Sequence, residues 1–391
     1  MAPYFARKLR VGMICHSSCG GSSKVAFELA RQLARRDHQV HFFSQYQPFG
    51  FTSDNPNLMT HFFQAKWQPD LHPSQLKTEW NNAEQEQFLR CLTEVIERDG
   101  LDILHFHYAI PFAFLVVELK RRLGGKCPVL IGTLHGTDVS IFGTYPEYAW
   151  KLKIALEQVD CLTTVSTSHA ELASRLLEIE PPLVIPNFLD LADYRPQPKL
   201  TRRKRPRLIH ISNFRPVKAP HEMISIFTRI LEQIEAELWL VGDGPGLEEL
   251  KPRFEEQGLT GKIRFWGLQE KVAPILAQAD LLLMTSVAES FCLVALEAMA
   301  CGVPVLATHV GGVPEVVKHA ETGYLYTAGD HEQAVEYGTK LLSDATLHRQ
   351  FAQASLVQAR KFDQSRVIGL YEQLYVSISW SSRPEEALAA G

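Results

Sequence analysis

Short apolar runs alternate with segments of helical spacing along the 391-residue chain. The runs are bounded by polar residues, which is typical of buried strands. Strands that alternate with helices predict a parallel sheet covered on both faces. In the first half, strands are expected at 9–15, 39–43, 102–106, 129–133, 161–165 and 183–186, and helices near 23–35, 81–98, 112–122, 145–158 and 168–178.

The same alternation starts again in the second half of the chain. We therefore predict an α/β protein with two Rossmann-like doubly wound domains that face a central cleft. Ligands then lie beyond the carboxyl ends of the strands. Strands are expected at 207–212, 237–242, 262–266, 281–285 and 303–307, and helices near 219–233, 246–256, 270–278, 292–300, 331–343 and 365–380.

Four segments follow from this pattern. We expect an N-terminal domain over 1–189 and a C-terminal domain over 207–362. A segment rich in Pro, Arg and Lys, 190–206, is the expected linker, and its basic run 202–205 is interpreted as solvated linker rather than a phosphate site. A final helix and tail, 363–391, is expected to pack back on the N-terminal domain.

Composition narrows the function classes. Hydrophobic residues make up 46% and charged residues 21%, and 40 basic against 44 acidic residues give a net charge of −4. This balance argues against a general electrostatic grip on nucleic acid. No apolar run is long enough to span a bilayer, and no secretion signal is apparent. Seven cysteines without a Cys-x-x-Cys pair favour reduced thiols in the cytoplasm over disulfides or zinc.

Glycines follow the first expected strand directly. Gly20 and Gly21 stand at the start of a helix, where backbone N–H groups can bind an anion. The segment around these glycines matches neither G-x-G-x-x-G nor a Walker motif, which disfavours a classical dinucleotide site or P-loop. A plain turn with Ser as the N-cap explains the residues equally well.

Charged residues follow two strands of the second half. Arg215 and Lys218 come after strand 207–212 and are placed to converge on one diphosphate. Glu289 is expected in a loop at the mouth of a helix that starts near Phe291, and Glu297 lies further along that helix. The alternative is that Glu289 caps the helix and Glu297 is solvated.

Histidines end two strands of the first half. His105 and His107 occupy alternate strand positions and face one side, but no third ligand is in sight. We therefore expect a satisfied, partly buried pair rather than a metal site. The chain has no Asp-x-Asp, which disfavours a metal held by such a pair on a nucleotide diphosphate.

Nine motifs are informative when they are taken together. The second half contains SNFRPVK (212–218), LVGDGP (240–245), the Glu-x7-Glu run 289–297, EAMACGVPVLAT (297–308), GGVPEV (311–316) and ETGYL (321–325), and the first half contains CGGSS (19–23), LDILHFHYAIP (101–111) and TLHGTD (133–138). The motifs of the second half resemble the carboxyl domain of retaining GT-B glycosyltransferases that use nucleotide sugars. Those of the first half narrow the resemblance to the N-acetylglucosaminyl-malate synthases of bacillithiol synthesis.

The resemblance implies a hexosyltransferase that moves N-acetylglucosamine from UDP-GlcNAc to the hydroxyl of L-malate with retained configuration. It implies no metal and no other cofactor. Its catalytic residues would be Glu289, Arg215, Lys218 and His135. Its donor-binding residues would be Gly20, Gly21, Trp266, Gly267, Leu268, Ser290, Phe291, Cys292, Leu293 and Glu297, and its acceptor-binding residues Ser18, Tyr108, Thr137 and Lys153.

Three departures from the family pattern keep the acceptor open. Cys292 stands where relatives usually have Gly, Lys153 where they have Arg, and 22–24 reads Ser-Ser-Lys. The alternatives are another small hydroxy acid, a sugar or a lipid-linked acceptor, for which 62–67 is a candidate surface. A UDP-GlcNAc epimerase and a non-catalytic sugar-nucleotide sensor are alternatives of other classes, and a homo-oligomer is also open.

Overall fold

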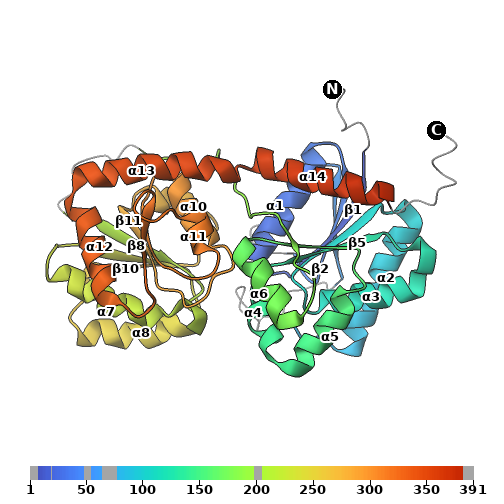
Figure 1. Cartoon of the computed structure of the whole chain (residues 1–391), viewed down its shortest axis with the longest axis horizontal. Helices are drawn as coiled ribbons and strands as arrows, with labels where there is room; N and C mark the ends of the chain where they lie inside the picture. The colour runs from blue at the N-terminus through green and yellow to red at the C-terminus, as the bar shows by residue number, and fades with distance from the viewer. Residues whose placement is uncertain (1–7, 19, 48–53, 64–76, 198–204, 382–391) are drawn as a thin grey trace. The chain divides into compact units, whose positions relative to one another are not determined.

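The computed structural model describes residues 8–18, 20–47, 54–63, 77–197 and 205–381. The chain divides into two compact units. Unit 1 comprises Met1–Pro186 and Val367–Gly391, and unit 2 comprises Asn187–Arg366. Each unit contains one sheet with helices packed on both faces (Figure 1).

Unit 1 is built on a seven-stranded sheet in the order β3-β2-β1-β4-β5-β6-β7, with every pairing parallel. Its strands are β1 (Arg10–Ile14), β2 (Gln39–Ser44), β3 (Leu58–Phe62), β4 (Ile103–His107), β5 (Val129–Leu134), β6 (Cys161–Thr164) and β7 (Leu183–Val184). Its helices are α1 (Gly21–Arg35), α2 (Asn82–Asp99), α3 (Phe112–Leu123), α4 (Thr137–Ser140), α5 (Pro146–Leu156), α6 (Thr167–Leu177) and most of α14 (Gln364–Ser381).

Alternate side chains of the strands serve the two faces of this sheet. Phe43 packs in the core cluster shared with α2 and α3, whereas its neighbour Phe42 lies edge-on to Phe27 of α1. On β4, Phe106 joins the α2–α3 side and His105 contacts Tyr375 of α14. Both faces of each central strand are therefore buried, which is why these strands read as continuous apolar runs.

Unit 2 repeats the plan with a six-stranded parallel sheet in the order β10-β9-β8-β11-β12-β13. Its strands are β8 (Arg207–Ile211), β9 (Glu237–Val241), β10 (Ile263–Gly267), β11 (Leu281–Met284), β12 (Val305–Thr308) and β13 (Gly323–Tyr326). Its helices are α7 (Pro220–Leu231), α8 (Pro245–Glu256), α9 (Ala273–Leu276), α10 (Leu293–Ala300), α11 (Val313–Val316), α12 (His331–Ser343) and α13 (Ala345–Ala359).

Each sheet has a topological switch point. Strand order reverses between β1 and β4 in unit 1 and between β8 and β11 in unit 2. Ligands of doubly wound sheets bind beyond the carboxyl ends of the strands at this point. The loops that follow these four strands are therefore where a site is expected in each unit.

The predicted fold class, two parallel α/β sheets, is confirmed, and each expected strand is present within a few residues of its expected bounds. The pattern did not predict the edge strands β3 and β13, the short helices α4 and α11, or α13. β3 alternates between buried and exposed positions at the sheet edge, so it lacks a continuous apolar run. The expected helix 270–278 is shorter, at Ala273–Leu276.

Residues 190–197, expected in a linker, lie with unit 2, where Leu189 bridges to Asp363. From Val367 on, α14 belongs with unit 1, where Glu372 pairs with Arg36. Parts of three predicted segments lie outside the described residues: the basic run (202–204), the candidate surface for a lipid-linked acceptor (64–67) and the C-terminal tail (382–391). Among the described helices, none combines the length and apolar character needed to cross a membrane.

Candidate active site

The switch point of unit 2 brings Lys218 and Glu289 together. Lys218 ends a 3₁₀ turn (Pro216–Lys218) after β8, and Glu289 lies in the loop after β11. Lys218 Nζ donates to Glu289 Oε1 at 2.7 Å, and Ser286 Oγ donates to the same oxygen at 2.7 Å. Both ionic side chains are mostly buried, with 20% and 10% exposed. A cation and a carboxylate are thus in direct contact, both mostly buried, beyond the carboxyl ends of β8 and β11.

The backbone around Glu289 is held by the GGVPEV segment. Gly312 N donates to Glu289 O at 2.9 Å. Gly311 has φ +50°, and a Cβ at this position would lie 1.9 Å from Glu289 O. Because only glycine permits this approach, Gly311 fixes the path of the Glu289 loop.

Arg215 lies in the same loop as Lys218. With its amide turned to accept, the Asn213 side-chain oxygen lies 2.9 Å from Arg215 Nε and 3.1 Å from Nη2. A Cβ at Gly244 would lie 1.8 Å from Asn213 O, so the Gly-Asp-Gly turn after β9 packs directly on this loop. The LVGDGP motif therefore shapes the backbone that carries the two cations.

The helix after Glu289 begins without a side-chain cap. α10 starts at Leu293, and its N-cap residue Cys292 adopts the left-handed region at φ 73°, ψ 67°. The interpretation of Glu289 as a helix cap is therefore wrong. Cys292 and Phe291 are buried, and Ser290 and Leu293 are half-buried. Burial, with the nearby Glu289 carboxylate, raises the pKa of the Cys292 thiol, so it stays protonated.

Glu297 is buried, with 4% exposed, so the interpretation of a solvated Glu297 is also wrong. Its Oε1 accepts a 2.8 Å hydrogen bond from Tyr194 Oη. The sequence pattern did not single out Tyr194, because it lies 103 residues away in a segment expected to be a linker. The only hint in the sequence was that a large aromatic residue stands among the prolines and basic residues of that segment.

Three predicted donor-binding residues, Trp266, Gly267 and Leu268, lie at the end of strand β10. The Trp266 ring packs against Trp239, with ring centroids 5.3 Å apart, and the Arg264 guanidinium lies 4.0 Å from the centre of the Trp266 ring. Gly267 O accepts from Gly242 N of the neighbouring strand end at 2.8 Å. Leu268 follows and is half-buried. The segment is thus held beside β9 at the carboxyl edge of the sheet.

In unit 1 the N-cap residue of α1 is Gly20, and no side chain caps the helix. The alternative in which a serine is the N-cap is therefore wrong. α1 begins at Gly21. Ser18 lies 3.1 Å from Ser23, oxygen to oxygen, and Ser23 Oγ donates to His16 O at 2.9 Å. The turn is thereby held by side chains within it, and the first N–H groups of a helix have no partner within the helix itself.

Two predicted acceptor residues are joined directly. Tyr108 Oη lies 2.6 Å from Thr137 Oγ1. Asp138, which the sequence pattern did not single out, holds their two loops together: its carboxylate accepts from Ala109 N at 3.0 Å and from Gly136 N at 2.7 Å. The sequence could have pointed to Asp138, because this residue is part of the TLHGTD motif. A buried carboxylate with backbone donors is a rigid anchor for both loops.

His135 lies beside this pair, buried under the carboxyl edge of the sheet. Its Nε2 lies 2.9 Å from His107 Nδ1, and burial lowers the pKa of His135 to about 4. The ring is therefore neutral at physiological pH and suited to hydrogen bonding rather than to carrying charge.

His105 and His107 do face one side, with ring centroids 4.2 Å apart. His105 is satisfied, at 2.6 Å from Tyr375 Oη and 2.7 Å from Thr133 Oγ1. The expectation of a satisfied, partly buried pair is wrong in two respects: both rings are completely buried, and His107 Nε2 has no partner among the described residues. Burial lowers the pKa of both histidines.

Lys153 pairs with a residue that is not among the acceptor candidates. It stands in the last turn of α5, which runs back from the carboxyl edge of the sheet toward the start of β6. Its Nζ pairs with Glu178 at 3.2 Å, just after the end of α6. None of the hydrogen bonds found in the described residues joins it to Ser18, Tyr108 or Thr137.

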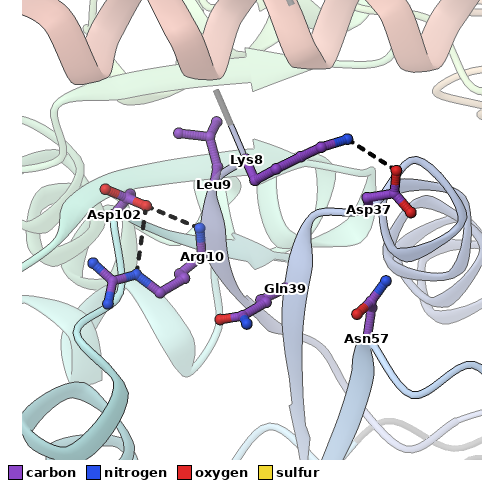
Figure 2. A pocket seen from close by; sticks show the side chains of 7 residues that line it. All are labelled: Lys8, Leu9, Arg10, Asp37, Gln39, Asn57 and Asp102. Atoms are coloured by element: carbon purple, nitrogen blue, oxygen red, sulfur yellow. Dashed lines mark hydrogen bonds and ion pairs between the residues drawn. The ribbon is translucent and has the colours of Figure 1, made fainter. Parts of the chain in front are cut away.

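A shallow polar pocket lies at the opposite, amino edge of the unit 1 sheet (Figure 2). Lys8 Nζ pairs there with Asp37 at 3.1 Å, and Asp102 accepts from Arg10 N at 2.9 Å. No predicted site residue lines this pocket, and its charges pair with one another.

The part of the chain that the structure describes contains no group of three or more His, Cys, Asp or Glu arranged to hold a metal ion. Its cysteines are free thiols: Cys15, Cys91, Cys127, Cys161, Cys292 and Cys301.

Two models of known protein families match this chain. A model described as "Glycosyltransferase Family 4" matches residues 19–193, and one described as "Glycosyl transferases group 1" matches residues 195–357. The chain is 34% identical over 381 residues to the N-acetyl-alpha-D-glucosaminyl L-malate synthase of Bacillus anthracis, covering 95% of this chain and 97% of that protein. The chain belongs to the GT-B glycosyltransferases.

The chain is also similar to more distant relatives. This glycosyltransferase is 26% identical over 313 residues to the GPI3 subunit of the Saccharomyces cerevisiae phosphatidylinositol N-acetylglucosaminyltransferase, covering 75% of this chain and 67% of that one. Two solved structures show the same fold. Sucrose-phosphate synthase of Thermosynechococcus elongatus has a TM-score of 0.81 at 20% identity, covering 96% of this chain and 100% of that one. Anabaena Alr3699/HepE in complex with UDP and glucose has a TM-score of 0.74 at 18%, covering 98% and 100%.

Proposed function

We propose that this glycosyltransferase moves N-acetylglucosamine from UDP-GlcNAc to the hydroxyl of L-malate with retention of configuration. The observation that carries the proposal is the 34% identity to the Bacillus anthracis synthase over 95% of the chain. The polar groups gathered at the switch point of unit 2 support the donor chemistry, and the Tyr108–Thr137 pair supports an acceptor site in unit 1.

In this proposal Lys218 and Arg215 bind the diphosphate of the donor. Negative charge grows on the diphosphate as the sugar–oxygen bond breaks, and fixed cations stabilise that charge without the help of a metal. Lys218 is already held at 2.7 Å from Glu289, which would hold hydroxyls of the donor sugar. Charge on the leaving group and recognition of the sugar are then coupled through one ion pair.

The acceptor would bind at Tyr108 and Thr137, whose hydroxyls lie 2.6 Å apart. Neutral His135 would contact the 6-hydroxyl of the sugar. The departing phosphate oxygen would take the proton of the malate hydroxyl as that hydroxyl attacks the same face, which retains configuration and needs no separate base. A two-carboxylate covalent mechanism needs a nucleophile on the opposite face, and we assign none.

The deciding experiment measures UDP release from UDP-GlcNAc with and without L-malate. Malate-dependent release supports the proposal. Release with another hydroxy acid, sugar or lipid-linked acceptor but not with malate would change the acceptor. Formation of an epimer without any acceptor would identify an epimerase instead, and UDP-GlcNAc binding without turnover would identify a sensor.

Two further measurements test the finer points. The coupling constant of the anomeric proton in the product, measured by NMR, distinguishes retention from inversion. Activity in excess chelator tests the absence of a metal requirement: we expect unchanged rates, and recovery only on adding magnesium or manganese would contradict it.

A further inference from the structure

Tyr194 is bonded to one of the two glutamates of the candidate donor site. Its hydroxyl donates to Glu297 Oε1 at 2.8 Å. Both side chains are buried, with 8% of Tyr194 and 4% of Glu297 exposed. A buried carboxylate is destabilising unless it accepts hydrogen bonds, and this contact supplies one of them.

The backbone before Tyr194 is shaped to deliver this hydroxyl. Leu189 N donates to Phe362 O at 3.1 Å and fixes the start of the segment on unit 2. Asp193 N then donates to Asp190 O at 3.1 Å, which closes a turn directly ahead of Tyr194. The position of the phenol thus follows from main-chain bonds on unit 2 rather than from a freely moving linker.

Tyr194 remains a donor throughout the working pH range. Burial and the Glu297 carboxylate both raise the pKa of its phenol well above the usual value. The phenol therefore keeps its proton, and the hydrogen bond to Glu297 keeps one direction.

We infer that Tyr194 is a positioning residue that holds the Glu297 carboxylate ready to accept the two hydroxyls of the donor's ribose. The inference rests on the proposed function, in which UDP-GlcNAc is the donor, and on the expected role of Glu297 as a donor-binding residue, to which we assign the ribose hydroxyls. A free glutamate side chain samples several rotamers, and a fixed donor removes that freedom before the nucleotide binds. A carboxylate accepts several hydrogen bonds at once, so it can serve a tyrosine and a diol together.

The test compares two nucleotides by isothermal titration calorimetry: UDP and 2′,3′-dideoxy-UDP, which lacks the diol. For Tyr194→Phe we expect UDP to bind about tenfold more weakly, as for loss of a hydrogen bond to a charged group. Binding of 2′,3′-dideoxy-UDP should stay within about twofold of wild type, because the contact that Tyr194 supports is absent from that ligand.

Two further variants sharpen the test. In Tyr326→Phe a buried phenol that donates to Met284 O at 3.2 Å is lost from the same unit, and we expect UDP affinity to be unchanged. In a Glu297→Gln background, Tyr194→Phe should weaken UDP binding much less than it does in wild type.

Equal weakening of both nucleotides by Tyr194→Phe would overturn the inference and leave a general structural role. Unchanged UDP affinity would overturn it as well. If the wild type binds both nucleotides equally, ribose recognition by Glu297 fails and the inference fails with it. The proposed transfer reaction is judged separately, by malate-dependent UDP release.

Discussion

Lys218 Nζ lies 2.7 Å from Glu289 Oε1, although 71 residues separate the two in the chain. The contact joins the loop after β8 to the loop after β11, the two strands at which the order of the sheet reverses. The lysine that we propose for the diphosphate and the glutamate that we propose for the sugar are therefore direct neighbours. The pairing makes the role of each testable on its own.

Replacing Lys218 with Ala should weaken UDP binding by about tenfold to a hundredfold, since a hydrogen bond between charged groups is lost. Calorimetric titration with UDP measures the change. Lys251→Ala is a matched control, because Lys251 is an exposed lysine of the same unit that pairs along its own helix, with Glu248. Equal UDP affinity in wild type and Lys218→Ala would remove Lys218 from the diphosphate site.

Replacing Glu289 with Gln should lower the transfer rate by roughly 10²–10³-fold while the protein stays folded. Gln has the shape of Glu and can still accept from Ser286, but it lacks the charge that pairs with Lys218. Turnover and the circular dichroism spectrum are compared with those of wild type and of a Glu248→Gln variant, in which an exposed glutamate is changed. Near-normal turnover with a native spectrum would contradict the assigned role.

A methyl group at Gly311 should disturb the Glu289 loop, because its Cβ would lie 1.9 Å from Glu289 O. We expect Gly311→Ala to lose most of its transfer activity and to melt at a lower temperature. Gly258→Ala separates the effect of backbone strain from the effect of the steric clash. Gly258 also has a positive φ, +66°, but no atom lies within 4 Å of its added Cβ. If both variants keep full activity, close packing at Gly311 does not position Glu289.

Cys292 tests the left-handed turn before α10, at φ 73°. Gly relieves the strain of this conformation, whereas a β-branched side chain increases it. We expect Cys292→Gly to melt close to wild type and Cys292→Val to be less stable by about 2 kcal/mol. Differential scanning calorimetry of the two variants gives the comparison, and equal stability of the Val variant would argue against the turn.

Buried histidines predict acid sensitivity. Burial lowers the pKa values of His16, His135 and His210 each to about 4 from the ordinary value of 6.5. In the unfolded chain these rings bind protons below about pH 6.5, whereas in the folded protein they stay neutral until about pH 4. The unfolded state therefore gains protons first, and stability is lost as the pH falls through this window, by about 1.4 kcal/mol per pH unit for each histidine.

Urea unfolding at a series of pH values between about 6.5 and about 4.5 measures this loss. His210 contacts Leu283 O and Ser212 Oγ, both at 2.9 Å, and a His210→Gln variant that still folds should show a shallower slope. A free energy of unfolding that stays constant over this range would show that the histidines titrate normally.

Much of the fold follows from local patterns. The alternation of apolar runs with helical segments predicted two parallel sheets, because a strand buried on both faces leaves a continuous apolar signature. Two edge strands leave a weaker signature: β3 is half-exposed, and β13, although buried, is only four residues long and begins with glycine. They were therefore not predicted.

The sequence by itself determined which residues follow a strand, and so which edge of each sheet carries Lys218, Glu289 and Tyr108. Only the tertiary structure decided their partners. Strand order brings Lys218 to Glu289, and a turn in an apparent linker brings Tyr194 to a buried Glu297. The reason is physical: local spacing sets secondary structure, whereas contacts between distant residues depend on how the strands are ordered and packed.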